Sequence, residues 1–243
     1  MLRLLLDAIQ SIKLVPSRLA LEPGARWYSE ARLSSPFAPR RRADGLAEGL
    51  TNADGVLGQF EFRRATRTGL SLKPGANQLV VLEAKMYSNL SPGTKNAPAY
   101  NQAVRNLACM AWALAQAGRK PTEFESLGFY VIAPAPARRR PGYSNLENFI
   151  DPSSIKSAMH QRIATYEAMQ REEALELRRW EQEHFVPLVD RLIDSGSLAV
   201  LSWEDCIREV QTADASAGEE LGHFYFTCLA TAQNEARDAS ILT

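Results

Sequence analysis

Two stretches of the chain have hydrophobic patterns typical of strands. In one, apolar and polar residues alternate, and in the other, apolar residues follow one another almost without interruption. After Asp54 the alternation places Val56 and Phe60 on the face of Asp54 and polar residues opposite, which predicts a half-buried strand. The nearly continuous apolar run 78–82 predicts a strand buried on both faces. That second strand ends in the triplet Glu83-Ala84-Lys85.

The rest of the chain alternates between helical and strand patterns. The apolar cluster at the start predicts an amphipathic first helix, and residues 102–114 carry the apolar stripe of a helix that enters the core. Pro187 is expected to end or kink the helix predicted for its region. Ser202 is expected to cap the helix that begins at residue 204. The further elements expected are a strand at 127–133, helices over 153–193, a strand at 198–203, a helix from 204 and a last helix around 219–236.

Charged residues at the ends of the two strands are the most informative chemistry. Strand alternation projects Glu83 and Lys85 to one face, while Ala84 turns away with its carbonyl available. An antiparallel pairing of Asp54 with Glu83 centres the turn just before Gly69. We therefore expect one ammonium and two carboxylates to share a pocket.

Two features complicate this pairing. Asp44 is a rival first acid, but pairing it with Glu83 would centre the turn between Arg63 and Arg64, at the end of the Phe-rich strand, so Asp54 is preferred. Pro74-Gly75 interrupts the pairing and predicts a bulge or an extra short strand at 69–73.

Asp54, Glu83 and the Ala84 carbonyl form a donor set that suits Mg²⁺, which binds proteins through one or two carboxylates and keeps several waters. Such an ion can polarise a phosphate and activate water, and Mn²⁺ is expected to substitute for it. Lys85 could orient the attacking water or neutralise charge that develops on the phosphate.

On these residues the chain resembles the PD-(D/E)xK nuclease superfamily, with Asp54 as the strand acid and Glu83-Ala84-Lys85 as the E-x-K triplet. The resemblance covers roughly residues 25–135. It implies an α/β fold with a restriction-endonuclease-like core, α-β-β-β-α-β, whose mixed central sheet is flanked by helices. It also implies catalytic support from Glu30 on a first helix and Gln102 on the helix after the triplet.

Each of these residues also has a structural interpretation. An E-x-K triplet can lie on a solvated face, and Glu30 can lie on an exposed helix surface. Gln102 and Arg105 can form the polar stripe of a core helix.

Net charge is zero over 243 residues, but residues 1–143 carry 20 Lys and Arg against 10 Asp and Glu. Residues 144–243 carry the opposite excess, so we expect the two halves to face different partners. The basic runs suit a phosphate backbone, although arginine runs also solvate loops. The arginines expected to contact nucleic acid are Arg40, Arg41, Arg42, Arg63, Arg64 and Arg105, with 138–140 in an exposed loop as a further basic run.

Composition favours one compact body. At 45% hydrophobic residues the chain can bury a core without cross-links. Its three widely spaced cysteines indicate neither a disulfide framework nor a zinc site, and a reducing cytoplasm is the expected location. No stretch reaches membrane-spanning length.

The sequence thus predicts a basic nuclease-like core, residues 1–143, and an acidic C-terminal helical extension, residues 144–243, packing on the same sheet. The expected activity is Mg²⁺-dependent hydrolysis of DNA or RNA, in phage defence or DNA repair. A nucleic-acid-binding or scaffolding protein of the same fold is the alternative. A homodimer and a partner subunit on the acidic half stay open.

Overall fold

The computed structural model describes residues 1–12, 18–49, 51–63, 69–86, 88–93, 97–135 and 146–241, with side chains as far as residue 231. In chain order its elements are α1 (Leu2–Ser11), β1 (Arg26–Leu33), β2 (Thr51–Gly58), β3 (Phe60–Phe62), β4 (Leu70–Leu72), β5 (Gln78–Ala84), α2 (Gln102–Gln116), the 3₁₀ turn η1 (Pro121–Glu123), β6 (Ser126–Ala133), α3 (Leu146–Phe149), α4 (Pro152–Ala168), α5 (Ala174–Trp180), the π-helical turn η3 (Glu181–Phe185), α6 (Val186–Asp194), β7 (Leu198–Ser202), α7 (Trp203–Ala213) and α8 (Ala215–Ile241).

A five-stranded mixed sheet in the order β1-β2-β5-β6-β7 forms the centre of the fold. β1, β2 and β5 pair antiparallel, whereas β5, β6 and β7 pair parallel. Parallel neighbours need a crossover, and α2 supplies it between β5 and β6. The α/β class and the mixed sheet flanked by helices are therefore confirmed.

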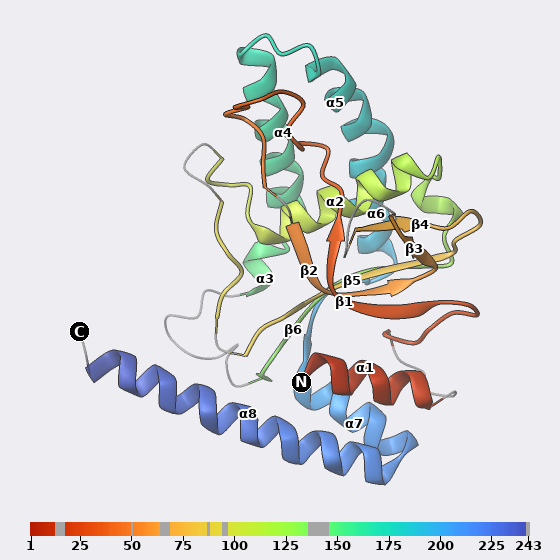
Figure 1. Cartoon of the computed structure of the whole chain (residues 1–243), viewed down its shortest axis with the longest axis vertical. Coiled ribbons are helices and arrows are strands. Elements are labelled where there is room, and N and C mark those ends of the chain that lie inside the picture. Colours follow the sequence, from red (N-terminus) through yellow and green to blue (C-terminus); the bar gives the residue numbers. More distant parts are fainter. Residues whose placement is uncertain are drawn as a thin grey trace.

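Helices cover both faces of this sheet (Figure 1). One face packs against α2, α4, α5 and α6, where Val81 and Phe129 meet Leu107 and Leu188. The other packs against α1, α7 and α8, where Leu82 meets Leu6 and Trp203. β5 alternates between the two cores, as expected for a strand buried on both faces.

The register of β2 with β5 is the one predicted. Gly55 pairs with Leu82 and Val56 with Val81, so one further step sets Asp54 opposite Glu83. The extra short strand near Pro74 is also present, as β4, which pairs with β3 in a separate two-stranded sheet.

The strand expected from Asp54 through Phe62 is instead broken after Gly58. At that glycine φ is +152°, and a Cβ there would lie 2.3 Å from the Gln78 carbonyl oxygen. Only glycine suits both the conformation and the close approach. The break lets β3 leave the central sheet and join β4.

The long helical region is interrupted at a place that the sequence pattern did not indicate. Gln170, with φ +50°, separates α4 from α5. Near Pro187 the helix continues through η3, which contains Glu183, the residue whose carbonyl Pro187 cannot bond. Ser202 caps α7 as predicted, accepting a hydrogen bond from the Asp205 N–H at 3.0 Å.

Among the described helices, none combines the length and the apolar character needed to cross a membrane.

Candidate active site

Asp54 and Glu83 meet where β2 and β5 stop pairing. The hydrogen-bonded pairing of β2 with β5 ends at Gly55 and Leu82, while β5 continues to Ala84 alongside β6. The Ala84 N–H then donates to the Asp54 carboxylate at 2.7 Å in place of a backbone acceptor. The splayed strand ends thus hold the two acids together.

In the β1–β2 pair, the side chains change the face of the sheet to which they point at the position of Asp54. On β1, Tyr28 and Ala31 both pack against the α2-side core, although three residues apart should face opposite ways. Glu30 between them has φ +54°, a left-handed conformation that resets the alternation. Across the ladder, Ala53 and Val56 likewise both face this core, and Asp54 lies between them.

The prediction that Glu30 lies on a helix is wrong. Residues 26–33 form the edge strand β1, and Glu30 is exposed, opposite Asp54 in the register. Its side chain makes no hydrogen bond or ion pair within the described part of the chain. Glu30 therefore stands beside the site without taking part in its contacts.

Glu83 is completely buried and both of its carboxylate oxygens have donors. Lys85 Nζ lies 3.2 Å from Oε2, and Gln102 Nε2 donates to the same oxygen at 2.8 Å. Asn106 Nδ2 donates to Oε1 at 2.6 Å. The expectation that Glu83 and Lys85 point to one face is confirmed, and the two side chains lie in contact.

These donors only partly offset the cost of burying Glu83. Burial, and next the neighbouring Asp54 carboxylate, raise the pKa of Glu83 to about 7, while Lys85 acts in the opposite direction. A second carboxylate beside a buried one makes ionisation of Glu83 unfavourable, so the pair is suited to sharing a cation or a proton.

Lys85 is held from both sides of its backbone. Its N–H donates to the Ile132 carbonyl at 2.8 Å, and its own carbonyl accepts a hydrogen bond from the Trp203 indole at 3.0 Å. Its side chain is 13% exposed, so the ammonium lies at the edge of the buried cluster. The contact from α7 fixes the backbone just after the last residue of β5.

Gln102 lies where the helix after the triplet begins, as predicted. Its backbone N–H donates to the Ser91 carbonyl at 2.9 Å, and its side-chain carbonyl accepts a hydrogen bond from the Ser91 N–H at 3.0 Å. The amide NH₂ is then left to point at Glu83. Asn101 caps the helix by accepting hydrogen bonds from the N–H groups of Ala103 and Val104. These contacts set the helix start against the strand end.

Asn106 is a site residue that the sequence interpretation missed. It follows Gln102 by four residues and therefore lies on the same face of α2, one turn further on. A second amide in a helix that is otherwise apolar on that face is the signal that could have identified it. Its Oδ1 is buried and has no partner among the described residues.

The rival acid Asp44 is engaged elsewhere. Its carboxylate contacts Arg171 at 2.7 Å, and although burial opposes ionisation, this bond and the Leu46 N–H lower its pKa. The structure thus places Asp54, not Asp44, beside Glu83.

Asp54 and Glu83 are a minimal donor set for a metal. No cluster of three or more His, Cys, Asp or Glu suited to a metal occurs among the described residues. The mutual effect of the two carboxylates on the pKa of Glu83 is the property that a divalent cation would relieve, so the residues fit a Mg²⁺ that keeps most of its waters. The Ala84 carbonyl as a third ligand stays a prediction.

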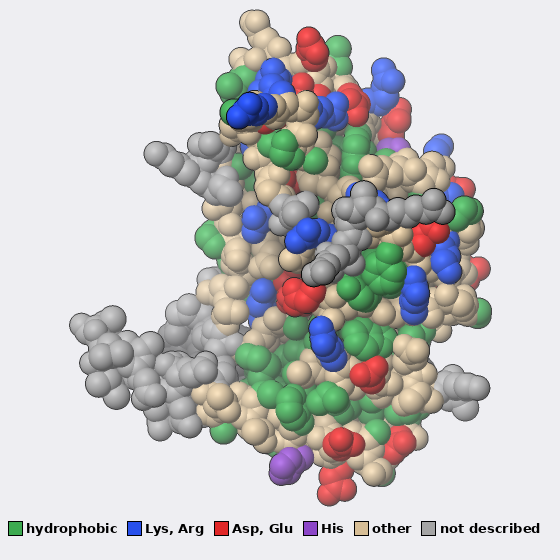
Figure 2. Space-filling model, viewed as in Figure 1, with side chains coloured by type: hydrophobic (Ala, Val, Ile, Leu, Met, Phe, Trp, Pro, Cys, Tyr) green, Lys and Arg blue, Asp and Glu red, His purple; other side chains and the backbone are tan. Residues whose placement is uncertain are grey.

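Basic side chains of residues 1–143 contact acidic side chains of residues 144–243. Arg40 forms a bidentate ion pair with Glu176 at 2.6 and 3.0 Å, and Arg41 lies 3.6 Å from Glu173. Figure 2 shows basic and acidic side chains side by side over the end of the molecule formed by α4 and α5. Two of the six arginines predicted to contact nucleic acid, Arg40 and Arg41, therefore pair with acidic residues of the same chain.

The other predicted nucleic-acid contacts differ in their surroundings. Arg63 donates to the Ser34 hydroxyl, Arg42 is exposed, and Arg64 and 138–140 lie outside the described residues. The side chain of Arg105, on α2 one turn beyond Gln102, makes no hydrogen bond or ion pair in the described part of the chain, and its Nε is buried.

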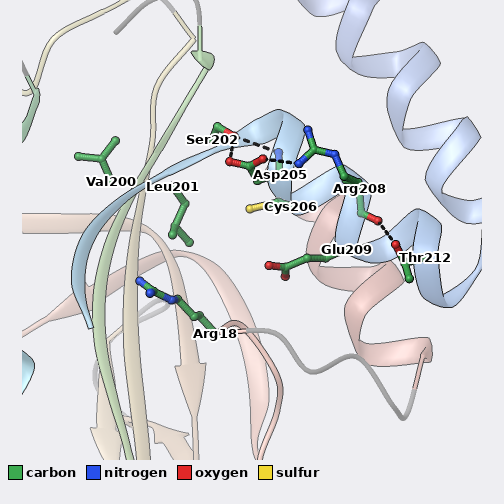
Figure 3. Close-up of a pocket in the computed structure, with 9 residues that line it drawn as sticks. All are labelled: Arg18, Val200, Leu201, Ser202, Asp205, Cys206, Arg208, Glu209 and Thr212. Carbon is green, nitrogen blue, oxygen red and sulfur yellow. Dashed lines mark hydrogen bonds and ion pairs between the residues drawn. The ribbon is translucent and has the colours of Figure 1, made fainter. Parts of the chain in front are cut away.

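A separate hollow of about 410 Å³ lies between β7 and α7, away from this cluster. Figure 3 shows Arg18 and Glu209 extending into it from opposite sides, while Asp205 and Arg208 pair with each other at its rim. None of the acids, amides or lysine described above is among its lining residues.

Comparisons with protein-family models, with curated proteins and with solved structures found no match to this chain.

Proposed function

We propose that this protein is a metal-dependent nuclease of the PD-(D/E)xK kind. The observation that carries the proposal is the convergence of Asp54 and Glu83 from two splayed strands, with Lys85 in contact with Glu83. Two carboxylates that can hold a cation, with an ammonium group beside them, suit phosphodiester hydrolysis.

The order of elements supports the same proposal. The chain proceeds through α1, three antiparallel strands β1, β2 and β5, the crossover helix α2 and the parallel strand β6. With the β3–β4 hairpin counted as an insertion, this order agrees with the α-β-β-β-α-β order that the resemblance to the PD-(D/E)xK superfamily implies, and so it supports the proposal.

Each residue has a role in this chemistry. Asp54 and Glu83 would hold Mg²⁺, which when bound polarises a phosphate oxygen and makes a nearby water a better nucleophile. Lys85 would offset negative charge as it develops on the phosphate. Gln102 and Asn106 position Glu83 by fixing both of its oxygens.

The test is cleavage of plasmid and single-stranded DNA and of RNA with Mg²⁺ or Mn²⁺. Glu83→Ala and Lys85→Ala should each lower the rate by at least about a hundredfold. Glu61→Ala and Lys73→Ala, which change exposed residues of the β3–β4 region, are the matched controls and should cleave as the wild type does. Equal rates for all five proteins would exclude the proposed chemistry.

One observation favours a second function, nucleic-acid binding without turnover. Glu83 already has three side-chain donors, so a protonated or hydrogen-bonded Glu83 could simply join β5 to α2. Salt-sensitive DNA binding, with no metal-dependent cleavage and no change in metal affinity on Glu83→Ala, would support this alternative.

A further inference from the structure

A polar cavity adjoins the cluster around Glu83. It has a volume of about 300 Å³, and the loop Gly45–Gly49, β2 and the start of α2 contribute to its wall. Its charged side chains are Glu48, Arg105 and Arg162. Two guanidinium groups against one carboxyl group give the cavity a positive character.

Three buried polar atoms of these side chains have no hydrogen-bond partner among the described residues. They are Oε2 of Glu48, Nε of Arg105 and Nε of Arg162. Buried polar atoms normally find a partner, and leaving one unpaired costs about 1–3 kcal/mol. Three side chains that line one cavity thus carry polar atoms without a partner among the described residues, which favours a polar ligand there.

Arg162 is fixed in place for such a guest. It is only 6% exposed, its Nη2 donates to the Leu46 carbonyl, and its guanidinium lies 5.1–5.6 Å from the ring centroids of Phe37, Tyr100 and Tyr166. Aromatic rings on its faces leave the in-plane N–H groups for recognition. Glu48 is held too, because the Ser35 hydroxyl donates to its Oε1.

The cavity lies within reach of a strand bound at Glu83. Arg105 follows Gln102 by three residues, about 4.5 Å along the axis of α2, and Thr51 precedes Asp54 by three, about 10 Å along β2. Successive phosphates of one strand are spaced by about 3.4 Å along a duplex axis. A phosphate one to three nucleotides from the scissile bond would therefore reach the two arginines.

We propose that the cavity lined by Glu48, Arg105 and Arg162 binds a phosphate group of the nucleic-acid substrate next to the cleavage site. The identity of the ligand rests on the proposed function, whereas the anion site rests on the cavity itself. Planar guanidinium groups match phosphate oxygens in pairs, and the Nε of each arginine has no hydrogen-bond partner among the described residues.

The first experiment titrates inorganic phosphate at low ionic strength and follows the melting temperature and calorimetric binding. Phosphate should stabilise the wild type, and Arg105→Gln should weaken its binding about tenfold. Because the Arg105 side chain makes no hydrogen bond or ion pair among the described residues and acts on Glu48 only through its charge, this change should lower the melting temperature without phosphate only slightly. Arg119→Gln, at the other end of α2, is the control and should bind phosphate as the wild type does.

The second experiment measures binding of oligonucleotides in EDTA, with a 5′-phosphate, a 3′-phosphate or only hydroxyl ends. An Arg105-dependent preference for one phosphorylated end identifies a terminal phosphate, and equal, Arg105-dependent binding of all three identifies an internal one. No stabilisation by phosphate, together with unchanged binding by Arg105→Gln, would overturn the proposal. Arg105-dependent phosphate binding in a protein that never cleaves would instead refute the nuclease and leave the anion site standing.

Discussion

Two buried carboxyl groups on the α2 side of the sheet, those of Glu83 and Glu48, have opposite surroundings. Glu83 has a donor on each oxygen and a second carboxylate as its neighbour. Glu48 has donors on one oxygen, an unpaired second oxygen and two arginines nearby. Burial raises the pKa of both. A carboxylate beside another acid suits a cation, and an open cavity with excess guanidinium groups suits an anion, so neighbours rather than burial distinguish the two sites.

The largest expected effect comes from removing the carboxylate of Asp54, the acid next to Glu83. Asp54→Asn keeps an acceptor for the Ala84 N–H but loses the charge, so cleavage should fall on the order of a thousandfold. Stabilisation of the protein by Mg²⁺ in a thermal melt should disappear as well.

Asp44→Asn is the matched control for that change. It breaks the ion pair with Arg171 and should lower stability in urea titrations, while cleavage per folded molecule stays at the wild-type rate. Wild-type cleavage by Asp54→Asn, or lost cleavage by folded Asp44→Asn, would reverse the assignment of the first acid.

The next effect is the pH dependence of stability without metal. The pKa of Glu83 is about 7 in the folded protein against an ordinary 4.5, so its contribution is present at low pH and is lost as pH rises through 7. Between pH 5 and pH 8 the wild type should lose about 2–3 kcal/mol relative to Glu83→Gln, measured by urea unfolding in EDTA. Mg²⁺ should restore much of this loss at pH 8. A constant difference between the two proteins across this range would contradict the environment described for Glu83.

A smaller effect should follow from removing one donor of Glu83. Asn106→Ala deletes a hydrogen bond to the charged form, so the acid limb of the pH–rate profile should move up by about one unit. Asn101→Ala, which removes the α2 cap instead, should cost about 1 kcal/mol of stability and leave the profile in place. Identical profiles for both variants would mean that Asn106 does not position Glu83.

The smallest effect is expected at Glu48. Tyr100→Phe removes a long hydrogen bond of 3.4 Å and keeps the ring that packs on Arg162, so the free energy of unfolding should change by less than about 1 kcal/mol. A larger loss in urea titrations would show that Glu48 depends on its donors as strongly as Glu83 does.

The sequence was sufficient for the strand ends because their signals are local. Apolar runs, a glycine near the turn and the triplet Glu83-Ala84-Lys85 were enough to predict the register of β2 with β5 and the contact of Glu83 with Lys85. Gln102 followed from the resemblance to the PD-(D/E)xK superfamily, which implies a polar residue on the helix after the triplet.

The sequence misled at β1 because of one backbone conformation. The left-handed Glu30 shifts the side-chain alternation within the strand, so residues 26–33 lack the two-residue period of a regular strand. A positive φ at a glutamate has no sequence signature, since glycine is the residue that normally marks it.

The pairing of Arg40 with Glu176 was beyond sequence reasoning for a different reason. The two residues are 136 positions apart, and only the packing of α5 beside the loop after β1 brings them together. A charge count by halves cannot distinguish arginines that such packing neutralises from Arg105, whose Nε has no hydrogen-bond partner among the described residues.

The hydrogen bond from the Trp203 indole to the Lys85 carbonyl has a practical consequence for shortened versions of the protein. Cutting the chain at the change of charge near residue 143 would remove this bond, the strand β7 that pairs with β6, and helices from both faces of the sheet, α4, α5 and α6 from one and α7 and α8 from the other. The smallest piece worth expressing for biochemistry therefore extends past α7, and a shorter fragment that failed to cut DNA would report on its own misfolding rather than on the chemistry of Lys85.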